Sequence, residues 1–457
     1  MKANQKMLQT NTGAGQATEA VKPMQPEELI EKELDVVRDK KGNIIRVVSN
    51  AQNFLRIFRN DPLLKGAICH NELSDATEII REMEWRRETS NLTDVDVSNV
   101  RAYVEKKYLG LHSRAYVDDA IRIVANENSY NPIIDIIESI EWDGQERILN
   151  LFPRYLGTER TLLNDEAVML IFMGGLERLF NPGSKFEYMP CIVGGQGCGK
   201  STLIRMLAMK DEYFCDDIRN ISDDKVFEKI RGHWIIEMAE MIATANAKTV
   251  EEIKAFISRQ KENYRFPYDK YSCDRLRRCI FIGTTNNSDF LPLDRTGNRR
   301  FIPIQAGVRE NIIHPLENEA ECREYIKQCW AEALVKYKSG DYSLDLSKEA
   351  KELLKVVQED YTPEDSRVGL IKKYLDSGNF EYVCAKQIWN DALHMDNEMK
   401  NYDSKDIGSI MNNQIEGWER VGSHKFEEFG VQRAWKRKVT SEFVEMADED
   451  LKSVPFE

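Results

Sequence analysis

An α/β core between a mainly helical N-terminal domain and a small C-terminal winged-helix-like module is the fold that the sequence predicts. Three observations predict it. A short apolar run, a loop with four glycines and an apolar helical pattern follow one another in residues 190–207. Two further apolar runs, at 233–237 and 278–284, are typical of buried strands. Helical periodicities precede residue 180 and follow residue 366.

The chain has 457 residues, which is more than one hydrophobic core usually serves, so two or three domains are expected. The predicted organisation is a flexible segment at 1–45, the helical domain at 46–160, the α/β core at 161–345, the winged-helix-like module at 366–440 and an acidic tail at 441–457.

Composition restricts the class of protein. The N-terminal residues lack the apolar stretch of a signal peptide, and no apolar run reaches membrane-spanning length, so we expect a soluble cytoplasmic protein without a membrane partner. Nine cysteines without a C-x-x-C pair predict reduced, mostly buried thiols rather than a zinc site or a disulfide framework. The net charge of −13 argues against a chain that coats nucleic acid throughout, but it is compatible with a local basic channel.

The N-terminal domain contains predicted helix caps and one acidic pair. Ser113 is expected to cap one helix, and Asn131, followed by Pro132, the next. Asp94 and Asp96 are suited either to holding Mg²⁺ or to capping a helix. With no third carboxylate placed beside them, we favour the cap.

Residues 194–201 fill the phosphate-loop pattern G-x-x-x-x-G-K-[ST]. Glycines let backbone N–H groups converge on phosphates, and the following helix N-terminus adds partial positive charge. Lys200 supplies a mobile charge and Ser201 a hydroxyl for Mg²⁺. The strand before and the helix after disfavour an accidental glycine-rich turn, so we expect a nucleoside triphosphate site for ATP and Mg²⁺. The expected binding residues are Gly194, Gly195, Gln196, Gly197, Cys198, Gly199, Lys200, Ser201 and Thr202.

Two acids and an asparagine are the candidates for the hydrolytic chemistry. Glu237 ends an apolar run, and a strand adjacent to the phosphate loop is expected to deliver it to Mg²⁺ as the Walker B acid and, with Ser201, as a metal ligand. Glu240 either polarises the attacking water or is a solvated glutamate at a helix start. Asn286 ends the next strand and is expected to hold the water as an uncharged sensor, whereas Asn287 is expected to be a turn residue.

Arg299 and Arg300 follow the sensor on a turn that precedes the strand-like FIPI. They are either a salt-bridge cluster or an arginine finger that one subunit inserts into its neighbour's nucleotide site. We favour the finger, which implies a ring of subunits.

Residues 254–278 hold eight Lys or Arg against three acids, with Tyr and Phe interleaved. Cations track phosphates and rings stack on bases, so the segment suits single-stranded nucleic acid. A subunit interface with rings packed beneath the charges is the alternative. The residues expected to contact DNA are Lys261, Tyr264, Arg265 and Lys270.

The C-terminal module shows three helical patterns and a strand-turn-strand pattern around Gly422 and Gly430. Its basic end, formed by Lys436, Arg437 and Lys438, suits the phosphates of duplex DNA. Docking of another protein is the alternative that the sequence leaves open.

These motifs, in this order, resemble the superfamily 3 helicase core of small DNA viruses and phages. More narrowly, they are similar to the virulence-associated E family of phages, prophages and mobile islands. The likeness covers residues 60–365, and its specific motifs are GGQGCGKST, HWIIEMAEM, YRFPYDKY, FIGTTN and DRTGNRRFIPI. The resemblance implies an AAA+-like ring ATPase that acts on DNA during replication of a mobile element in a bacterial cytoplasm.

The resemblance also implies a role for each matching residue. Lys200 and Ser201 become phosphate and Mg²⁺ contacts, Glu237 the Walker B acid, Asn286 the sensor, and Arg299 or Arg300 the finger. Related cores place two acids side by side on the Walker B strand, whereas two residues separate Glu237 from Glu240 here. The sequence therefore leaves the identity of the catalytic base open.

We expect an ATP-driven DNA helicase or translocase whose ring, hexameric by resemblance, moves basic hairpins along one strand. Its expected partners are single-stranded DNA, duplex origin DNA, further copies of the chain and a separate primase. The alternative is an ATP-gated initiator or host-interference assembly that binds DNA without unwinding it. A small-molecule phosphotransferase is disfavoured, because it has no use for the basic, aromatic segment.

Overall fold

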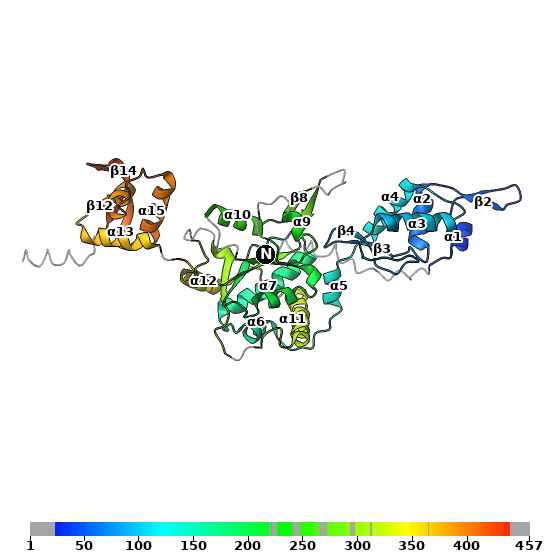
Figure 1. Ribbon diagram of the computed structural model, residues 1–457, viewed down its shortest axis with the longest axis horizontal. Coiled ribbons are helices and arrows are strands. Elements are labelled where there is room, and N and C mark those ends of the chain that lie inside the picture. Colours follow the sequence, from blue (N-terminus) through cyan, green and yellow to red (C-terminus); the bar gives the residue numbers. More distant parts are fainter. Residues whose placement is uncertain are drawn as a thin grey trace, which may run out of the picture. The chain divides into compact units, whose positions relative to one another are not determined.

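The computed structural model describes residues 23–218, 221, 226–240, 247–264, 272–292, 298–310, 313–363 and 365–438. The chain divides into two compact units, Met1–Tyr361 and Thr362–Glu457 (Figure 1). None of the helices in the described part combines the length and hydropathy of a membrane-spanning segment. All nine cysteines are free thiols and seven of them are buried, as predicted.

The N-terminal part of the first unit combines helices with two small antiparallel hairpins. Its elements are α1 (Pro26–Lys32), β1 (Val36–Arg38), β2 (Ile44–Val47), α2 (Ala51–Asn60), β3 (Ile68–Asn71), β4 (Ala76–Ile79), α3 (Asp94–Lys107) and α4 (Arg114–Glu127). Leu29 of α1 is buried in the same core as Phe54 and Val104. The predicted flexible segment 1–45 is therefore wrong over residues 26–45, because their apolar side chains complete this core.

The acidic pair at the start of α3 is part of a helix cap. The N-cap is Thr93, whose hydroxyl accepts the Asp96 N–H, while Asp96 accepts the Thr93 N–H in return. Asp96 is buried and also accepts hydrogen bonds from Trp85 and Arg87. Burial opposes ionisation of this carboxyl, but the hydrogen bonds from Trp85, Thr93 and Arg87 outweigh it and lower the pKa. The capping interpretation is confirmed for Asp96, whereas Asp94 follows the cap residue.

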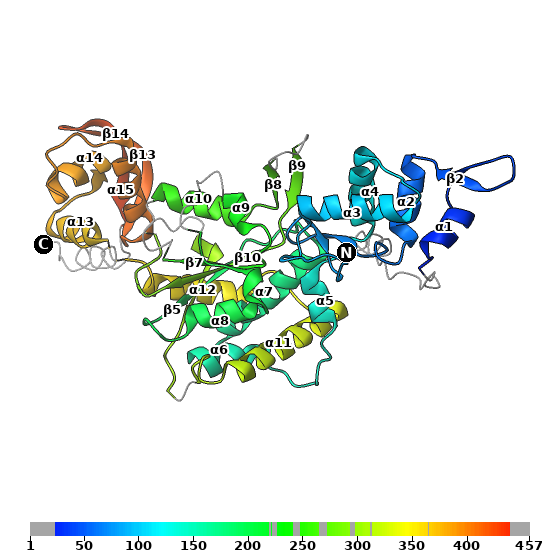
Figure 2. The same ribbon diagram turned by 45° about the vertical axis from the view of Figure 1, so that its right-hand side comes forward.

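Five parallel strands form the centre of the first unit, in the order β11-β5-β10-β7-β6 (Figure 2). They are β5 (Met189–Val193), β6 (Phe214–Cys215), β7 (Ile235–Ala239), β10 (Ile280–Thr285) and β11 (Phe301–Gln305). The helices of this core are α5 (Pro132–Glu138), α6 (Ile148–Leu156), α7 (Leu162–Phe180), α8 (Lys200–Leu207), η1 (Asp211–Tyr213), α9 (Val226–Ile230), α10 (Ala247–Ile257), η2 (Asn298–Arg300), α11 (Glu319–Ser339) and α12 (Lys348–Asp360). The predicted α/β class is confirmed.

Each strand sends alternate side chains to two helical layers. On β7, Ile235 packs in the cluster that contains residues of α7, α8 and α11, whereas Ile236 and Met238 pack with residues of α9 and α10. Figure 2 shows α9 and α10 over one face of the sheet and α6, α7, α8 and α11 over the other. Glu237 shares the face of Ile235, so the alternation directs it toward α8.

The core is longer than the predicted 161–345. Helices α5 and α6 belong to the same hydrophobic cluster as α7 and α11, and α12 adds Ala350 and Leu354 to it. Ser113 and Asn131 cap α4 and α5, as predicted. The boundary at residue 160 therefore lies too late in the chain and the boundary at 345 too early.

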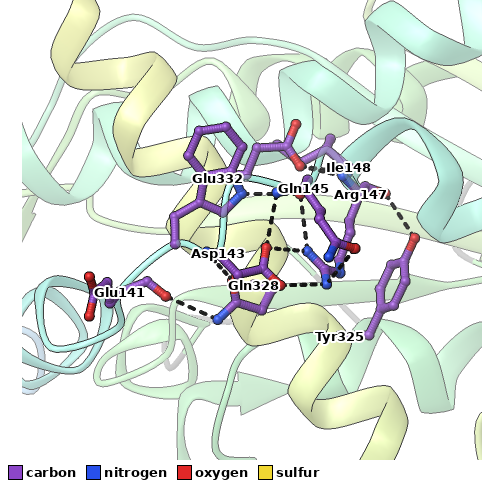
Figure 3. A network of polar contacts seen from close by, with 9 residues as sticks. Glu141, Asp143, Gln145, Arg147, Ile148, Tyr325, Gln328 and Glu332 are labelled. Carbon is purple, nitrogen blue, oxygen red and sulfur yellow. Dashed lines mark hydrogen bonds and ion pairs between the residues drawn. The ribbon is translucent and has the colours of Figure 1, made fainter.

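A buried carboxylate joins α11 to the start of α6 (Figure 3). Glu332 is 1% exposed and accepts the backbone N–H groups of Arg147 and Ile148. Arg147 is the N-cap of α6 and makes no capping hydrogen bond with its own side chain. Its guanidinium instead pairs with Asp143, whose N–H donates to Gln328 of α11. Helix α11 thus supplies the acceptors that the start of α6 lacks locally.

Glu332→Ala should lower the free energy of unfolding by about 2–3 kcal/mol, because the buried Ile148 N–H and the partly buried Arg147 N–H lose their acceptor. Glu332→Gln should cost less, since one amide oxygen replaces the shared carboxylate oxygen. The matched control is Glu324→Ala on the same helix, an exposed residue paired with Lys327, which should change stability by less than about 0.5 kcal/mol. Equal losses for the two alanine variants in urea unfolding would contradict this role for Glu332.

The second unit joins helices to a three-stranded antiparallel sheet of order β12-β14-β13. Its elements are α13 (Ser366–Ser377), β12 (Tyr382–Cys384), α14 (Ala385–Gln387), η3 (Ile388–Ala392), α15 (Asn401–Asn413), β13 (Trp418–Phe426) and β14 (Gly430–Arg437). The turn between the long strands directly precedes Gly430, as predicted. Gly422 instead lies within β13, where the pairing register shifts.

Arg437 is a structural residue of this unit. Its guanidinium donates to the carbonyls of Leu375 and Gly378 and lies over the Trp418 ring. The phosphate contact at Arg437 stays a prediction, and one of its nitrogens, Nη2, joins β14 to the end of α13. Lys438 is exposed.

Candidate functional site

The predicted phosphate loop, Glu240 and the predicted sensor meet at one cleft, and Glu237 contacts its lining residues Ser201 and Thr284. It lies where β5, β10 and β7 end, because parallel neighbouring strands bring their carboxyl ends to the same edge of a sheet. The cleft has a volume of about 550 Å³. Its lining residues are Gln196, Gly197, Cys198, Gly199, Lys200, Ser201, Thr202, Ala239, Glu240, Thr284, Thr285, Asn286, His314 and Leu316.

The loop from β5 to α8 needs glycine for its backbone shape. Gly197 and Gly199 have φ angles of 81° and 87°, where other residues are strained. A Cβ atom at Gly199 would also lie 2.7 Å from Pro315. Glycine is thus required at position 199 both by conformation and by contact. Gly194 opens the loop against Ala306, and space surrounds Gly195.

Lys200 is the charged residue of the loop. Its ammonium group donates to the carbonyl oxygens of Gly194 and Gly195 at 2.6 and 2.9 Å, and to Oδ1 of Asn286 at 2.8 Å. The predicted phosphate loop and the predicted sensor are therefore in direct contact through Lys200.

Ser201 and Glu237, the predicted metal ligands, also touch. The hydroxyls of Ser201 and Thr284 both donate to Oε1 of Glu237 at 2.6 Å, and Glu237 is 1% exposed. Strand β7 continues to Ala239, so Glu237 lies in its middle rather than at its end. Strand β7 does not pair with β5, because β10 is inserted between them, but Glu237 still reaches the loop through Ser201. Thr284 of β10 bridges the gap.

Glu240 faces the cleft from the end of β7. Its backbone has a φ of 52°, and its side chain accepts the Asn286 N–H at 2.8 Å and the Thr285 hydroxyl at 2.7 Å. A solvated position at a helix start is therefore wrong for Glu240, because it follows a strand and is fixed by the neighbouring strand. Asn287 is the turn residue that we predicted, since its Oδ1 accepts the Asp289 N–H.

Arg299 and Arg300 lie at the other end of the sheet. They directly precede β11, which pairs with β5 from Phe301 opposite Met189 to Gln305 opposite Val193, a length of about 13 Å. Neither arginine is among the residues that line the cleft. Both approach Glu187 at 3.7 Å, but the Arg299 side chain is 74% exposed and that of Arg300 only 21%. Arg299 is the freer of the two.

The basic segment forms an antiparallel hairpin of β8 (Lys261–Tyr264) and β9 (Cys273–Leu276) that extends away from the sheet (Figure 2). Six of its eight cations are described, and each is paired with an acid. The pairs are Lys254 with Glu251, Arg259 and Arg277 with Glu262, Lys261 with Asp274, Arg275 with Asp75, and Arg278 with Glu72. Arg265, Lys270 and the side chain of Tyr264 lie outside the described residues.

The base of this hairpin is held by the turn of the N-terminal β3–β4 hairpin. Asp75 and Glu72 of this turn pair with Arg275 and Arg278, and the carbonyl oxygen of Leu73 accepts a hydrogen bond from the Gly232 N–H. Burial lowers the pKa of both guanidinium groups, and for Arg278 the neighbouring Glu72 offsets part of this effect. The turn therefore contacts the segments that lead into β7 and β10, at the end of the sheet opposite the cleft. A cavity of about 320 Å³ lies at this junction.

Sequence reasoning missed five residues of the cleft, one of which, Ala239, ends β7. Thr284 and Thr285 precede the sensor on β10, and strand alternation alone directs one hydroxyl to each acid. His314 and Leu316 carry no motif, because their position depends on how the chain returns from β11 to the phosphate loop.

Residues 137–363 match the family model of the virulence-associated protein E-like domain. The chain therefore contains a virulence-associated protein E-like domain. This domain, called the E-like domain below, starts in α5 and ends after α12. It contains every residue of the cleft, the β8–β9 hairpin, Arg299 and Arg300. The predicted family is confirmed.

Two solved structures also share similarity with this chain. Both are described as A form apo structures of the NrS-1 C terminal region, with 13% identity and TM-scores of 0.43 and 0.42. They cover 81% and 82% of this chain, and 96% of each of those chains is covered. A likeness at this level carries no functional information. A search of curated proteins found no match.

Thr284→Val should lower the free energy of unfolding of the E-like domain by about 1–3 kcal/mol, because the buried Glu237 carboxylate loses one of two hydroxyl donors. The same substitution should cost less in a Glu237→Gln background, where a neutral amide replaces the carboxylate. Denaturant unfolding of the wild type, the two single variants and the double variant measures this double-mutant cycle. An equal cost in both backgrounds would contradict the bridging role of Thr284.

Proposed function

We propose that the cleft binds ATP with Mg²⁺ and hydrolyses it. The supporting observation is that Lys200, Ser201, Glu240 and Asn286 line one cleft, while the buried Glu237 accepts the hydroxyl of Ser201. The loop N–H groups and the ammonium group suit phosphate oxygens, and a hydroxyl paired with a carboxylate suits a hard divalent cation. A P-loop, AAA+-like core is the fold that this proposal requires.

The two acids have different surroundings and receive different roles in this proposal. Glu237 is buried and engaged by the hydroxyls of Ser201 and Thr284, so it is assigned to the metal site. Glu240 lines the cleft and is oriented by the N–H of Asn286, so it is assigned as the general base for water. Asn286 holds the water and the terminal phosphate without adding charge.

Steady-state ATPase assays test these assignments. Lys200→Ala should abolish turnover. Glu240→Gln should lower kcat by about 10²–10⁴-fold while KM for ATP changes little, because a general base acts in the transition state. Glu237→Gln should instead raise the Mg²⁺ concentration needed for half-maximal rate. A Glu240→Gln variant with wild-type kcat would contradict the assignment of the base.

We also propose that Arg299 acts in the cleft of a neighbouring copy within a ring. Its position at the end of the sheet opposite its own cleft, and its exposure, support a role in trans rather than in cis. The hexameric ring that the sequence suggested remains part of this proposal.

Mixing two inactive variants tests the role in trans. Arg299→Ala and Lys200→Ala should each be inactive alone, but an equimolar mixture should recover about a quarter of the wild-type rate, because one random interface in four combines an intact loop with an intact arginine. Arg300→Ala, whose side chain is mostly covered, should keep most of the activity. Absence of recovery in oligomers shown to exchange subunits would contradict the shared site.

The substrate of the motor is proposed to be DNA, with the β8–β9 hairpin following one strand. Because each described cation of the segment is paired with an acid, the residues proposed to contact the strand are Arg265 and Lys270. The C-terminal unit is proposed to be a winged-helix-like module that binds duplex origin DNA through Lys436 and Lys438. The proposal also includes a separate primase as a partner and the bacterial cytoplasm as the location. The second candidate is an ATP-gated initiator that does not unwind.

Single-stranded DNA should stimulate the ATPase, and Arg265→Ala with Lys270→Ala should remove the stimulation while basal turnover survives. Lys261→Ala should have a smaller effect, because Asp274 already matches its charge. Strand displacement on a forked duplex separates the two candidates: stimulation without unwinding favours the initiator. Stimulation that is unchanged in the double variant would contradict the hairpin as the DNA contact.

A further inference from the structure

The chain returns to the phosphate loop after β11 and is fixed there at several points. The Ala306 N–H donates to the Val193 carbonyl, and the Ile313 N–H donates to the Arg154 carbonyl at 3.1 Å. Asn318 then caps α11. Between these anchors, buried Pro315 lies against Gly199. The segment 313–316 is thus a rigid wall beside the loop.

His314 presents a defined donor from this wall. Its Nδ1 accepts the Leu316 N–H at 3.2 Å, which leaves the ring hydrogen of a neutral imidazole on Nε2. Nε2 lies 3.3 Å from the Cβ position of Gly199, at the edge of the phosphate loop. Leu316 also lines the cleft, and 53% of this apolar residue is exposed.

His314 and Leu316 come from a different segment of the chain than the rest of the cleft lining. All other lining residues belong to the phosphate loop or to the ends of β7 and β10, which the proposed function assigns to phosphates, Mg²⁺ and water. A cleft of about 550 Å³ has room for more than a phosphate chain. Recognition of a nucleoside needs an apolar surface and a few directed hydrogen bonds. Leu316 supplies the surface and His314 the donor.

We propose that His314 and Leu316 form the nucleoside subsite of the cleft, with the His314 Nε2–H donating to an oxygen or ring nitrogen of the nucleoside. The inference rests on the proposed nucleotide site and adds the residues that make this chain prefer a nucleoside triphosphate to an inorganic phosphate chain.

Isothermal titration of the full chain with Mg²⁺-ATP and with Mg²⁺-tripolyphosphate tests the proposal. The wild type should bind ATP more tightly. His314→Asn keeps an acceptor near the Nδ1 position for the Leu316 N–H but removes the Nε2–H, and it should lower the preference for ATP about tenfold. His314→Gln places an amide donor near Nε2 and should keep most of the preference. Both variants should bind tripolyphosphate as the wild type does.

Leu316→Ala should likewise weaken ATP binding, by about three- to tenfold, and leave tripolyphosphate binding unchanged. Its matched control is Leu353→Ala on α12, which removes a leucine that is 44% exposed and outside the cleft. This control should bind both ligands as the wild type does.

Two results would overturn the subsite: a His314→Asn variant with the full preference for ATP, or equal weakening of both ligands in all three substitutions at His314 and Leu316. Failure of the proposed function has a different signature. Wild-type protein that binds neither ligand, or Lys200→Ala protein that binds both as tightly as the wild type, would remove the phosphate site itself.

Discussion

The hydrogen bonds from Ser201 and Thr284 to the buried Glu237 carboxylate hold the cleft together. They connect the start of α8 with the inserted strand β10 and with β7. A carboxylate in this position is costly without donors, so the three elements are restrained to one arrangement. The alternation of side chains along the strands makes the contact available, because it turns Glu237 and Thr284 to the same face of the sheet as α8.

The parallel sheet separates two kinds of contact. At the carboxyl ends of β5, β10 and β7 lie the predicted phosphate loop, Glu240 and Asn286, and Glu237 contacts the loop from the middle of β7. At the amino ends lie the arginines before β11, the base of the β8–β9 hairpin and the N-terminal turn at residues 72–75. The strands β7 and β10 join the two ends directly. In the proposed motor, a change at the acids therefore reaches the hairpin through two rigid strands rather than through a chain of loops.

Much of this site was accessible to sequence analysis, because local chemistry determines it. The predicted phosphate loop and Asn286 follow strands that apolar runs identify, Glu237 lies within such a strand, and loop geometry requires glycine at 199. The strand order was not accessible, since no local signal tells that β10 separates β7 from β5. The ion pairs of the basic segment were not accessible either, because some of them are long-range. Asp75 and Glu72, about 200 residues earlier in the chain, neutralise Arg275 and Arg278. For the same reason, no local sequence pattern identified His314 as a cleft residue, because its position depends on the path of the chain after β11.

Hydrogen exchange with and without Mg²⁺-ATP tests the central claim most directly, because it maps the ligand onto the whole chain at once. The account predicts slower exchange in the loop 194–202, at 237–240, at 284–286 and in the wall 313–316 of the same sample. Slower exchange confined to other cavities, such as the junction of the N-terminal turn with residues 275–278, would contradict it.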